Sequence, residues 1–80
     1  METYEVEMIL DHKTIKTNSS GYSDIKLQIK WLGYDKPIDL TWEKLKEMIE
    51  DIPYLVEDYF KNKGLQFEEH KSLNGLYKLI

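Results

Sequence analysis

The chain has 80 residues, 41% of them hydrophobic and 12% aromatic, which suits one small folded domain and argues against general disorder. Its eleven basic residues are all lysines and its fifteen acidic residues leave a net charge of −4, so direct binding of nucleic acid, which usually draws on arginine and excess positive charge, is not expected. There is no cysteine, which excludes disulfides and thiolate metal sites.

The sequence shows no feature of a membrane, metal or cofactor-binding protein. No apolar run approaches the ~18 residues of a membrane span, and no signal-peptide pattern opens the chain. His12 and His70 lie far apart and stand in no recognisable ligand spacing, so we interpret both as exposed surface or loop residues. We therefore expect a soluble, intracellular protein without a metal or a cofactor.

The first predicted element is a strand. Residues 4–10 begin with alternating apolar and polar side chains and continue apolar through Ile9 and Leu10, so the end of this strand is expected to be the more enclosed part. Residues 11–24 contain the turn-forming stretch 18–21 and no sustained period. This second segment is predicted to be a long hairpin loop.

A hairpin follows. Residues 25–31 alternate strictly, which predicts a strand with one apolar face. Its apolar residues are Ile25, Leu27, Ile29 and Trp31. Residues 35–37 indicate a turn, and 39–43 can return as the partner strand. This hairpin is expected to bring Trp31 and Tyr34 close together near one strand end.

The strongest helix signals lie after residue 51. Residues 44–50 are compatible with either a helical turn or an extended linker. Beyond them, Pro53 suits a first helical turn, Gly64 suits a left-handed stop, and apolar residues recur at three- and four-residue spacing. These apolar residues are Ile52, Leu55, Val56, Tyr59 and Phe60. The sequence predicts a helix over 52–63 with one stripe facing a sheet.

The C-terminal residues are less regular. Residues 65–73 are compatible with a short second helix ended by Asn74-Gly75, and 76–80 with a strand or an apolar end that docks on a partner. We therefore predict two parts: a domain over residues 1–64 and a tail over 65–80. The fold class expected for the domain is α+β, a three-stranded antiparallel sheet with the C-terminal helix packed across it.

Several blocks of sequence, taken in order, resemble the chromodomain family. They are YEVE at 4–7, ILDH at 9–12, IKWLGY at 29–34, TWE at 41–43 and DIPYLVEDY at 51–59. The resemblance covers about residues 3–63 and implies a curved sheet of the SH3-like partial-barrel type. The stretch WEKLKEMIEDIPYLV after Leu40-Thr41 is most similar to chromodomains at the C-terminal end of retrotransposon integrases.

The resemblance implies a methyl-lysine cage. Chromodomains bind a histone tail that carries a methylated lysine, and the tail adds as a strand between the N-terminal segment and the stretch before the helix. The three aromatic residues of the cage would be Tyr4, Trp31 and Tyr34 here, and Asp39 matches an acidic position beside it. A methylated ammonium keeps its charge, loses much of its hydration and is attracted to electron-rich ring faces.

The resemblance also implies a groove for the rest of the peptide. The groove residues would be Glu5, Val6, Glu43, Glu47 and Ile49. The chain departs from the family at two positions, since Lys44 stands where proline is usual and Glu47 where an asparagine commonly bonds the peptide backbone. A carboxylate can accept a hydrogen bond but cannot donate one, so the contact made by Glu47 would differ.

The residues alone leave a second interpretation of the tryptophans open. On periodicity, Trp31 belongs with the inward residues of its strand, and only the resemblance moves it toward the cage. Trp42, between the third strand and the helix, is interpreted as a core residue.

We do not expect an enzyme, because no nucleophile–base pair, phosphate loop or metal spacing is present. The sequence favours a nuclear module that binds a methylated histone tail and targets a larger protein, such as a retrotransposon integrase, to heterochromatin. Its acidic charge suits a lysine-rich tail. The alternative is a structural or dimerising module, related to chromoshadow domains, that binds an unmodified partner or a second copy through its helix or tail.

Overall fold

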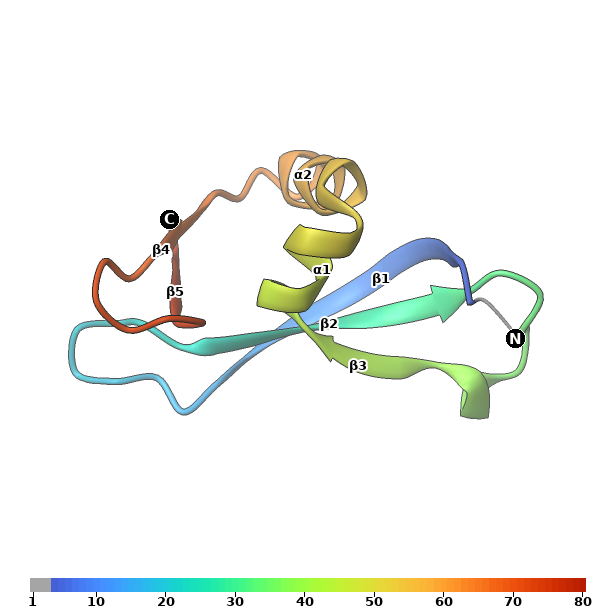
Figure 1. The fold of residues 1–80 in the computed structure, drawn as a ribbon, viewed down its shortest axis with the longest axis horizontal. Coiled ribbons are helices and arrows are strands. Elements are labelled where there is room, and N and C mark those ends of the chain that lie inside the picture. Colours follow the sequence, from blue (N-terminus) through green and yellow to red (C-terminus); the bar gives the residue numbers. More distant parts are fainter. Residues whose placement is uncertain (1–3) are drawn as a thin grey trace.

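A computed structural model describes residues 4–80 of the chain. Strands β1 (Val6–Ile15), β2 (Asp24–Trp31) and β3 (Thr41–Lys44) form one antiparallel sheet in the order β1-β2-β3 (Figure 1). The central strand β2 pairs with both neighbours, so each outer strand keeps one edge without a strand partner among the described residues.

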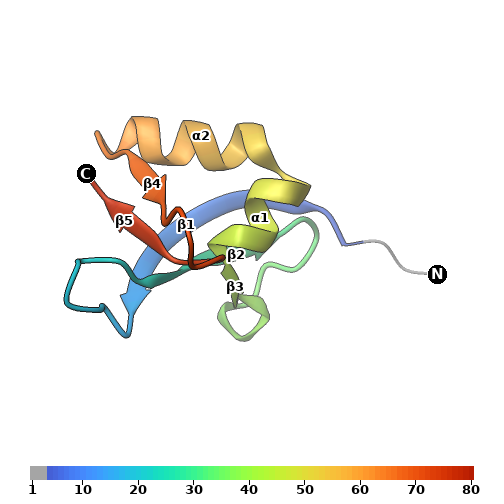
Figure 2. The ribbon, with the colours of Figure 1, turned by 60° about the vertical axis from the view of Figure 1, so that its left-hand side comes forward.

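Two helices cover one face of this sheet. Helix α1 (Leu45–Asp51) continues from the end of β3, and helix α2 (Pro53–Asn62) passes above the sheet (Figure 2). The helix predicted over 52–63 is confirmed, as is the α+β fold class, and the ambiguous segment before it is a helix. None of the described helices is long and apolar enough to cross a membrane.

The core follows from the alternation in β2. Its residues Ile25, Leu27 and Ile29 are each 0% exposed and face the helices. The other buried hydrophobic residues are Leu45, Met48, Val56, Tyr59, Phe60 and Tyr77. Both helices and the C-terminal segment therefore contribute to a single core, as the inward row of β2 predicts.

The prediction of a long loop over residues 11–24 is wrong for the first part of this range. Strand β1 continues to Ile15, and only residues 16–23 form the connection to β2. The register of β1 shifts between Val6 and Met8 and again between Ile9 and Asp11, which indicates two bulges. The shifts interrupt the period-2 alternation, so the sequence of this strand does not show a regular apolar face.

The two histidines are not the exposed residues that the sequence suggested. His12 is half-buried in β1, where its Nδ1 lies 2.7 Å from the Tyr59 hydroxyl and its ring contacts Phe60. His70 is also half-buried, and its Nδ1 accepts hydrogen bonds from the backbone N–H groups of Ser72 and Leu73. The hydrogen bond of His12 therefore joins β1 to α2, whereas those of His70 stabilise the turn that follows it.

The C-terminal segment forms a second, two-stranded sheet instead of a helix over 65–73. Strand β4 (Phe67–Glu69) pairs with β5 (Tyr77–Leu79), and Tyr77 also bridges Ser23 with two backbone hydrogen bonds of 2.7 and 2.8 Å. Gly64, with φ of 69°, ends α2 and lets the chain turn toward this hairpin. The expected strand in 76–80 is confirmed.

Trp42 lies outside the core. Its register partner in β2 is Gln28, which alternates with the buried residues Leu27 and Ile29. Cross-strand partners point to the same face of a sheet, so Trp42 lies on the face away from the helices. The prediction that Trp42 belongs to the core is wrong, because the sequence does not give the register of β3.

Candidate functional site

Three aromatic rings meet at the end of β2. The centroid of the Tyr4 ring lies 6.2 Å from that of Trp31, with an interplanar angle of 72°, and 5.6 Å from that of Tyr34, with an angle of 45°. Together with Asp39 and Thr41 these rings line a pocket of about 280 Å³. The structure therefore brings together the three aromatic residues and the acidic residue that the sequence grouped, and we name them the aromatic pocket.

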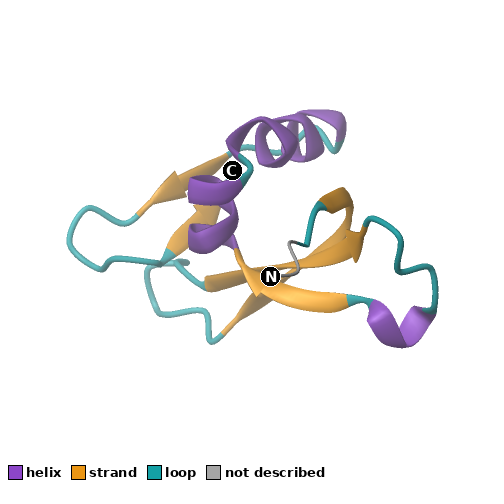
Figure 3. Cartoon of the chain, turned by 45° about the vertical axis from the view of Figure 1, so that its right-hand side comes forward, coloured by secondary structure: helices purple, strands orange, loops and turns teal. Residues whose placement is uncertain are grey.

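The pocket lies at the end of the sheet opposite the C-terminal hairpin. Figure 3 shows there the short helical turn between β2 and β3, a 3-10 helix over Pro37–Asp39. The strand predicted to begin at Asp39 begins two residues later, at Thr41, because Asp39 still belongs to this turn. Its position in the turn places Asp39 beside the rings.

A tight turn sets the positions of two rings. The Tyr34 N–H donates to the carbonyl of Trp31 over 3.1 Å, and Gly33 between them has φ of 85°. A positive φ at the third residue is the signature of a type II turn, for which glycine is preferred. The turn returns the chain at once, so Trp31 and Tyr34 border the same pocket.

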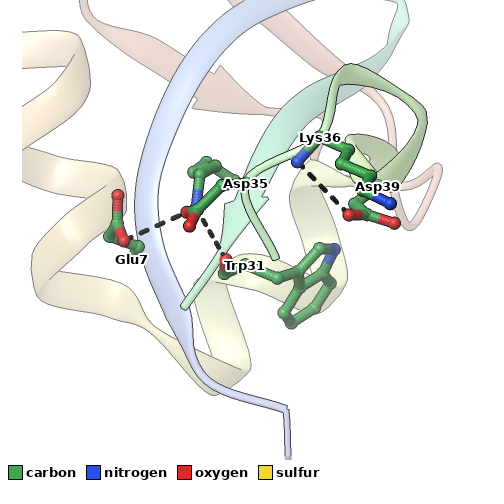
Figure 4. Close-up of polar contacts among 6 residues, drawn as sticks. Glu7, Trp31, Asp35, Lys36 and Asp39 are labelled. Carbon is green, nitrogen blue, oxygen red and sulfur yellow. Dashed lines mark hydrogen bonds and ion pairs between the residues drawn. The ribbon is translucent and has the colours of Figure 1, made fainter. Parts of the chain in front are cut away.

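Lys30 fastens this turn to β1 (Figure 4). Its Nζ donates to the carbonyl of Trp31 over 2.9 Å and to Asp35 over 2.9 Å, and it reaches Glu7 at 3.5 Å. The hydrogen bond to Asp35 is the main reason why the pKa of Lys30 is raised. The ammonium thus stays charged and links the strand start, the strand end and the turn.

Trp31 both borders the core and belongs to the aromatic pocket. Its side chain packs against the core, as periodicity suggests, and it also lines the aromatic pocket. Its indole Nε1–H donates to the Thr41 hydroxyl over 2.8 Å, which fixes the ring orientation. Thr41 was not among the predicted site residues; its place in the block TWE, two residues after Asp39, is the signal by which it could have been found.

Asp39 supplies the negative charge of the pocket. Its Oδ2 accepts a hydrogen bond of 3.3 Å from the backbone N–H of Lys36 (Figure 4), within the first turn of the 3-10 helix. The side chain is half-buried and lines the same pocket as the rings. A carboxylate beside three ring faces is a favourable environment for an organic cation.

The predicted groove residues do not all lie together. Val6 begins β1 and Glu5 directly precedes it; the Glu5 carbonyl accepts a hydrogen bond of 2.8 Å from the backbone N–H of Leu32. Glu43 lies in β3 and Glu47 in the first turn of α1. The structure thus places two of these residues at the start of β1 or directly before it, one in β3, and one in the helix that follows β3.

Ile49 lies elsewhere. It lines a second pocket of about 770 Å³, formed mainly by α2 and the segment that leads to β4. None of the residues of the aromatic pocket lines this second one. Its assignment to the peptide groove therefore finds no support in the position of its side chain.

Lys44 fits the backbone that a proline would impose. It precedes α1 with φ of −66°, within the range to which a proline ring restricts the chain. The departure from the family pattern at this position therefore leaves the entry into α1 in the usual conformation.

The fold and the pocket define a class of protein. A small three-stranded sheet covered by two helices, with an aromatic pocket at one sheet end and open edges on the outer strands, has the features of a binding module: the pocket can accommodate a small cation and the edges an extended peptide.

The chain belongs to the chromo domain family. The Chromo (chromatin organisation modifier) domain matches residues 4–62. Chromo domain-containing protein 2 of Schizosaccharomyces pombe is 35% identical over 63 residues, which cover 79% of this chain and 15% of that protein. No solved structure matches the chain significantly. Chromo domains are chromatin-associated, non-catalytic modules with a general capability to bind methylated lysine.

Proposed function

We propose that this chain binds a methylated lysine of a histone tail in the aromatic pocket. The observation that carries the proposal is the convergence of Tyr4, Trp31 and Tyr34 around one small cavity, with Asp39 in its wall. Methylation leaves the positive charge of a lysine and removes donors that water would solvate. Such a cation gains more from ring faces than an unmodified ammonium does.

The size and strength of the site agree with a side chain as ligand. The pocket of about 280 Å³ lies just below the range of ~300–1,000 Å³ of sites that enclose whole small molecules. Each ring contact contributes roughly 0.5–2 kcal/mol, depending on how dry the site is. Three rings together supply a few kcal/mol, enough to distinguish methylated from unmodified lysine by one or two orders of magnitude.

The peptide backbone would bind by strand addition. The outer edges of β1 and β3 carry backbone groups without a strand partner among the described residues, and an extended peptide can pair with such an edge. Glu5, Glu43 and Glu47 lie near these edges and attract a lysine-rich tail. The alternation of a strand would then direct one lysine side chain of the tail into the pocket.

The larger role proposed is that of a tether in the nucleus. The chain spans 15% of the length of its fission yeast relative, so modules of this type occur as small parts of long proteins. The resemblance of the stretch after Thr41 to integrase chromodomains supports a retrotransposon integrase as the protein that would be targeted to heterochromatin. This subtype rests on the sequence resemblance alone.

Calorimetric titration with a histone-tail peptide, unmodified and trimethylated, tests the proposal. We expect micromolar binding that requires the methyl groups and weakens about tenfold in Tyr34→Ala, because loss of one ring contact removes ~1–2 kcal/mol. Tyr34 is 40% exposed, so the variant should fold. Tyr54→Ala, at an 82% exposed position on α2, is the matched control and should bind normally.

Equal affinity for the two peptides, or undiminished affinity in Tyr34→Ala, would contradict the proposal. Either result would favour the alternative, a chromo-like module that binds an unmodified protein or a second copy.

A further inference from the structure

A groove lies between helix α2 and the segment that leads into β4. Its volume is about 770 Å³, and its apolar lining includes Ile49, Pro53, Phe60, Leu65 and Phe67. Three of these, Ile49, Leu65 and Phe67, pack against the core yet are only half-buried, so they keep apolar surface open to the groove. The wall over residues 64–67 lies outside the range 4–62 that the chromo domain matches. We call this cavity the hairpin groove.

Strand β4 presents an open edge to the hairpin groove. The backbone groups of Gln66 and His70 bond to the opposite strand segment, and successive residues of an antiparallel pair point alternately to its two sides. The N–H and C=O groups of Phe67 and Glu69 therefore point away from β5. No strand lies on that side among residues 4–80, and β4 stands between α2 and β5 (Figure 2). Such an edge accepts an extended peptide as a further strand.

The face of β4 that turns toward the core carries one apolar and one acidic side chain. Glu69 is the register partner of the buried Tyr77, whose ring lies 5.7 Å from that of Phe67. Cross-strand partners share a face, so Phe67 and Glu69 follow each other on this face at a spacing of two. Glu68 and Lys78, which are partners of each other, lie on the opposite face.

The end of the hairpin groove near Glu69 is acidic. Burial is the main cause that raises the pKa of Tyr77, and Glu69 and Glu50 add to it, so both carboxylates lie near the Tyr77 hydroxyl. Neither carboxylate forms an ion pair within the described part of the chain. Lys46, one turn before Glu50 in α1, instead lies with its aliphatic chain against Gly75. A cation at this end of the groove would therefore meet two carboxylates without a partner.

The other charges of the groove indicate which partner it fits. Glu57 and Lys61, one turn apart on α2, both line it and balance each other, so Glu50 and Glu69 leave a net attraction for a basic partner. A second copy of the chain is disfavoured, because pairing two β4 edges would bring the carboxylates of both copies together over three residues.

We propose that the hairpin groove binds an extended peptide that adds as a strand to β4 and carries an apolar and a basic side chain two residues apart. The apolar side chain enters the groove beside Phe67, and the basic side chain lies between Glu50 and Glu69. A small apolar molecule would leave the backbone groups of this edge unpaired. The site shares no lining residue with the aromatic pocket and does not depend on recognition of methyl-lysine.

Fluorescence anisotropy of the labelled peptide TKTLTKT, titrated with the full chain, tests the proposal. Its lysines stand two residues on either side of the leucine, which serves both strand directions. We expect saturable binding that is about tenfold weaker for TETLTET, whose charges are reversed, and for TKTSTKT, which lacks the apolar side chain. The proposal would be overturned if the chain failed to bind TKTLTKT or bound the three peptides equally.

Glu69→Lys tests the acidic end of the groove. We expect it to bind TKTLTKT about tenfold more weakly and to prefer TETLTET, because the charge it presents to the peptide is reversed. Asp58→Lys changes the net charge equally at an exposed position of α2 that does not line the groove, and it should bind TKTLTKT normally. An equal loss in both variants would refute a role of Glu69.

Tyr34→Ala separates this site from the aromatic pocket. It should bind TKTLTKT as tightly as the unaltered chain does, whatever its affinity for a methylated histone tail. A loss of TKTLTKT binding in Tyr34→Ala would place the peptide in the aromatic pocket and overturn the proposal.

Methylation of single backbone nitrogens of TKTLTKT tests the strand addition. Only every second N–H of an added strand donates to its neighbour. We expect N-methylation to abolish binding at one of two adjacent positions, the leucine and the threonine after it, and to be tolerated at the other; equal effects would refute strand addition. Light scattering of the chain without peptide should show a monomer. A dimer that TKTLTKT dissociates would identify a second copy as the occupant and overturn the proposal.

Discussion

Gly33 decides how the rings of the aromatic pocket are presented. Its φ of 85° allows the turn in which Tyr34 bonds back to Trp31. A Cβ at this position would meet no atom within 4 Å, so a larger residue would be opposed by backbone strain and not by a clash. The pocket therefore depends on a conformation that other residues adopt only at a cost of roughly 1–2 kcal/mol.

Gly33→Ala should lower the free energy of unfolding by about 1 kcal/mol and also weaken binding of the methylated peptide, because the turn relaxes and the rings separate. Urea unfolding and calorimetry measure the two effects. Gly64→Ala is the matched control, since Gly64 has φ of 69° and equally open space, but lies at the end of α2. The control should lose similar stability and bind normally; a loss of binding in both variants would refute a local role of Gly33.

Thr41 orients the indole of Trp31 through the hydrogen bond of 2.8 Å. Thr41→Val keeps the shape of the side chain but leaves the indole N–H without this acceptor, so we expect a loss of about 1 kcal/mol in the free energy of unfolding and weaker peptide binding. Thr41→Ser keeps the hydroxyl and should restore the binding. If Thr41→Ser bound as weakly as Thr41→Val, the methyl group and not the hydrogen bond would be the cause.

At the scale of the elements, the C-terminal hairpin is part of the core. Tyr77 in β5 is 3% exposed, its ring lies 5.7 Å from that of Phe67, and its backbone is paired with Ser23. The hairpin therefore covers one end of the main sheet (Figure 1). A segment that looked separable in sequence supplies a buried ring to the folded domain.

Tyr77→Ala should lower the free energy of unfolding by roughly 3 kcal/mol, in the range found when large buried side chains are truncated. The exposed Tyr54 provides the control, and Tyr54→Ala should change stability by less than about 0.5 kcal/mol. Chemical denaturation measures both. An equally small effect at Tyr77 would mean that the hairpin is dispensable for the fold.

The regular elements could be predicted from the sequence and the irregular ones could not. The alternation in β2 and the stripe of α2 each repeat a single period, so most of their inward residues were identified; Leu55, which was placed in the stripe, is 38% exposed and lies outside the core. The bulges of β1 interrupt its period, and as a result His12 was assigned to a loop although it faces α2. The hairpin pairing of β4 with β5 depends on contacts with Ser23 that no local pattern reveals.

The aromatic pocket was predictable for a different reason. Periodicity alone assigned Trp31 to the core; the order of the aromatic blocks grouped it with Tyr4 and Tyr34. The register of β3 determines that Thr41 lies beside the rings and that Trp42 lies on the other face of the sheet, and this register cannot be read from the sequence. The resemblance to chromodomains therefore indicated the rings, and the pairing of strands determined what surrounds them.

At the scale of the whole molecule, buried tyrosines limit stability at alkaline pH. Burial is the main cause that raises the pKa of Tyr59 and of Tyr77 above the ordinary value of 10.0, with Asp11 and Glu69 adding to it. The folded state then holds protons that the unfolded chain releases. The contribution of these two tyrosines to the free energy of unfolding is therefore fully present below pH 10.0, and it is lost as the pH rises through their raised pKa values. The raised pKa of Lys30 acts in the same direction.

We therefore expect the urea midpoint to be constant near neutral pH and to fall above about pH 10, as tyrosinate absorbance appears. Tyr59→Phe removes one of the titrating groups and should make this fall shallower, although it also loses the hydrogen bond with His12. A midpoint that fell equally steeply in the variant would show that Tyr59 does not contribute to the alkaline transition.

The measurement that tests the central claim most directly uses the two indole N–H groups as separate reporters in a two-dimensional NMR titration. Trp31 lines the aromatic pocket, and Trp42 lies on the opposite face of the sheet. With a trimethylated histone-tail peptide we predict a large, saturable shift of the Trp31 indole signal, an unmoved Trp42 signal, and no comparable change with the unmodified peptide. A Trp31 signal that stays in place, or moves equally with both peptides, would contradict methyl-lysine recognition by this pocket.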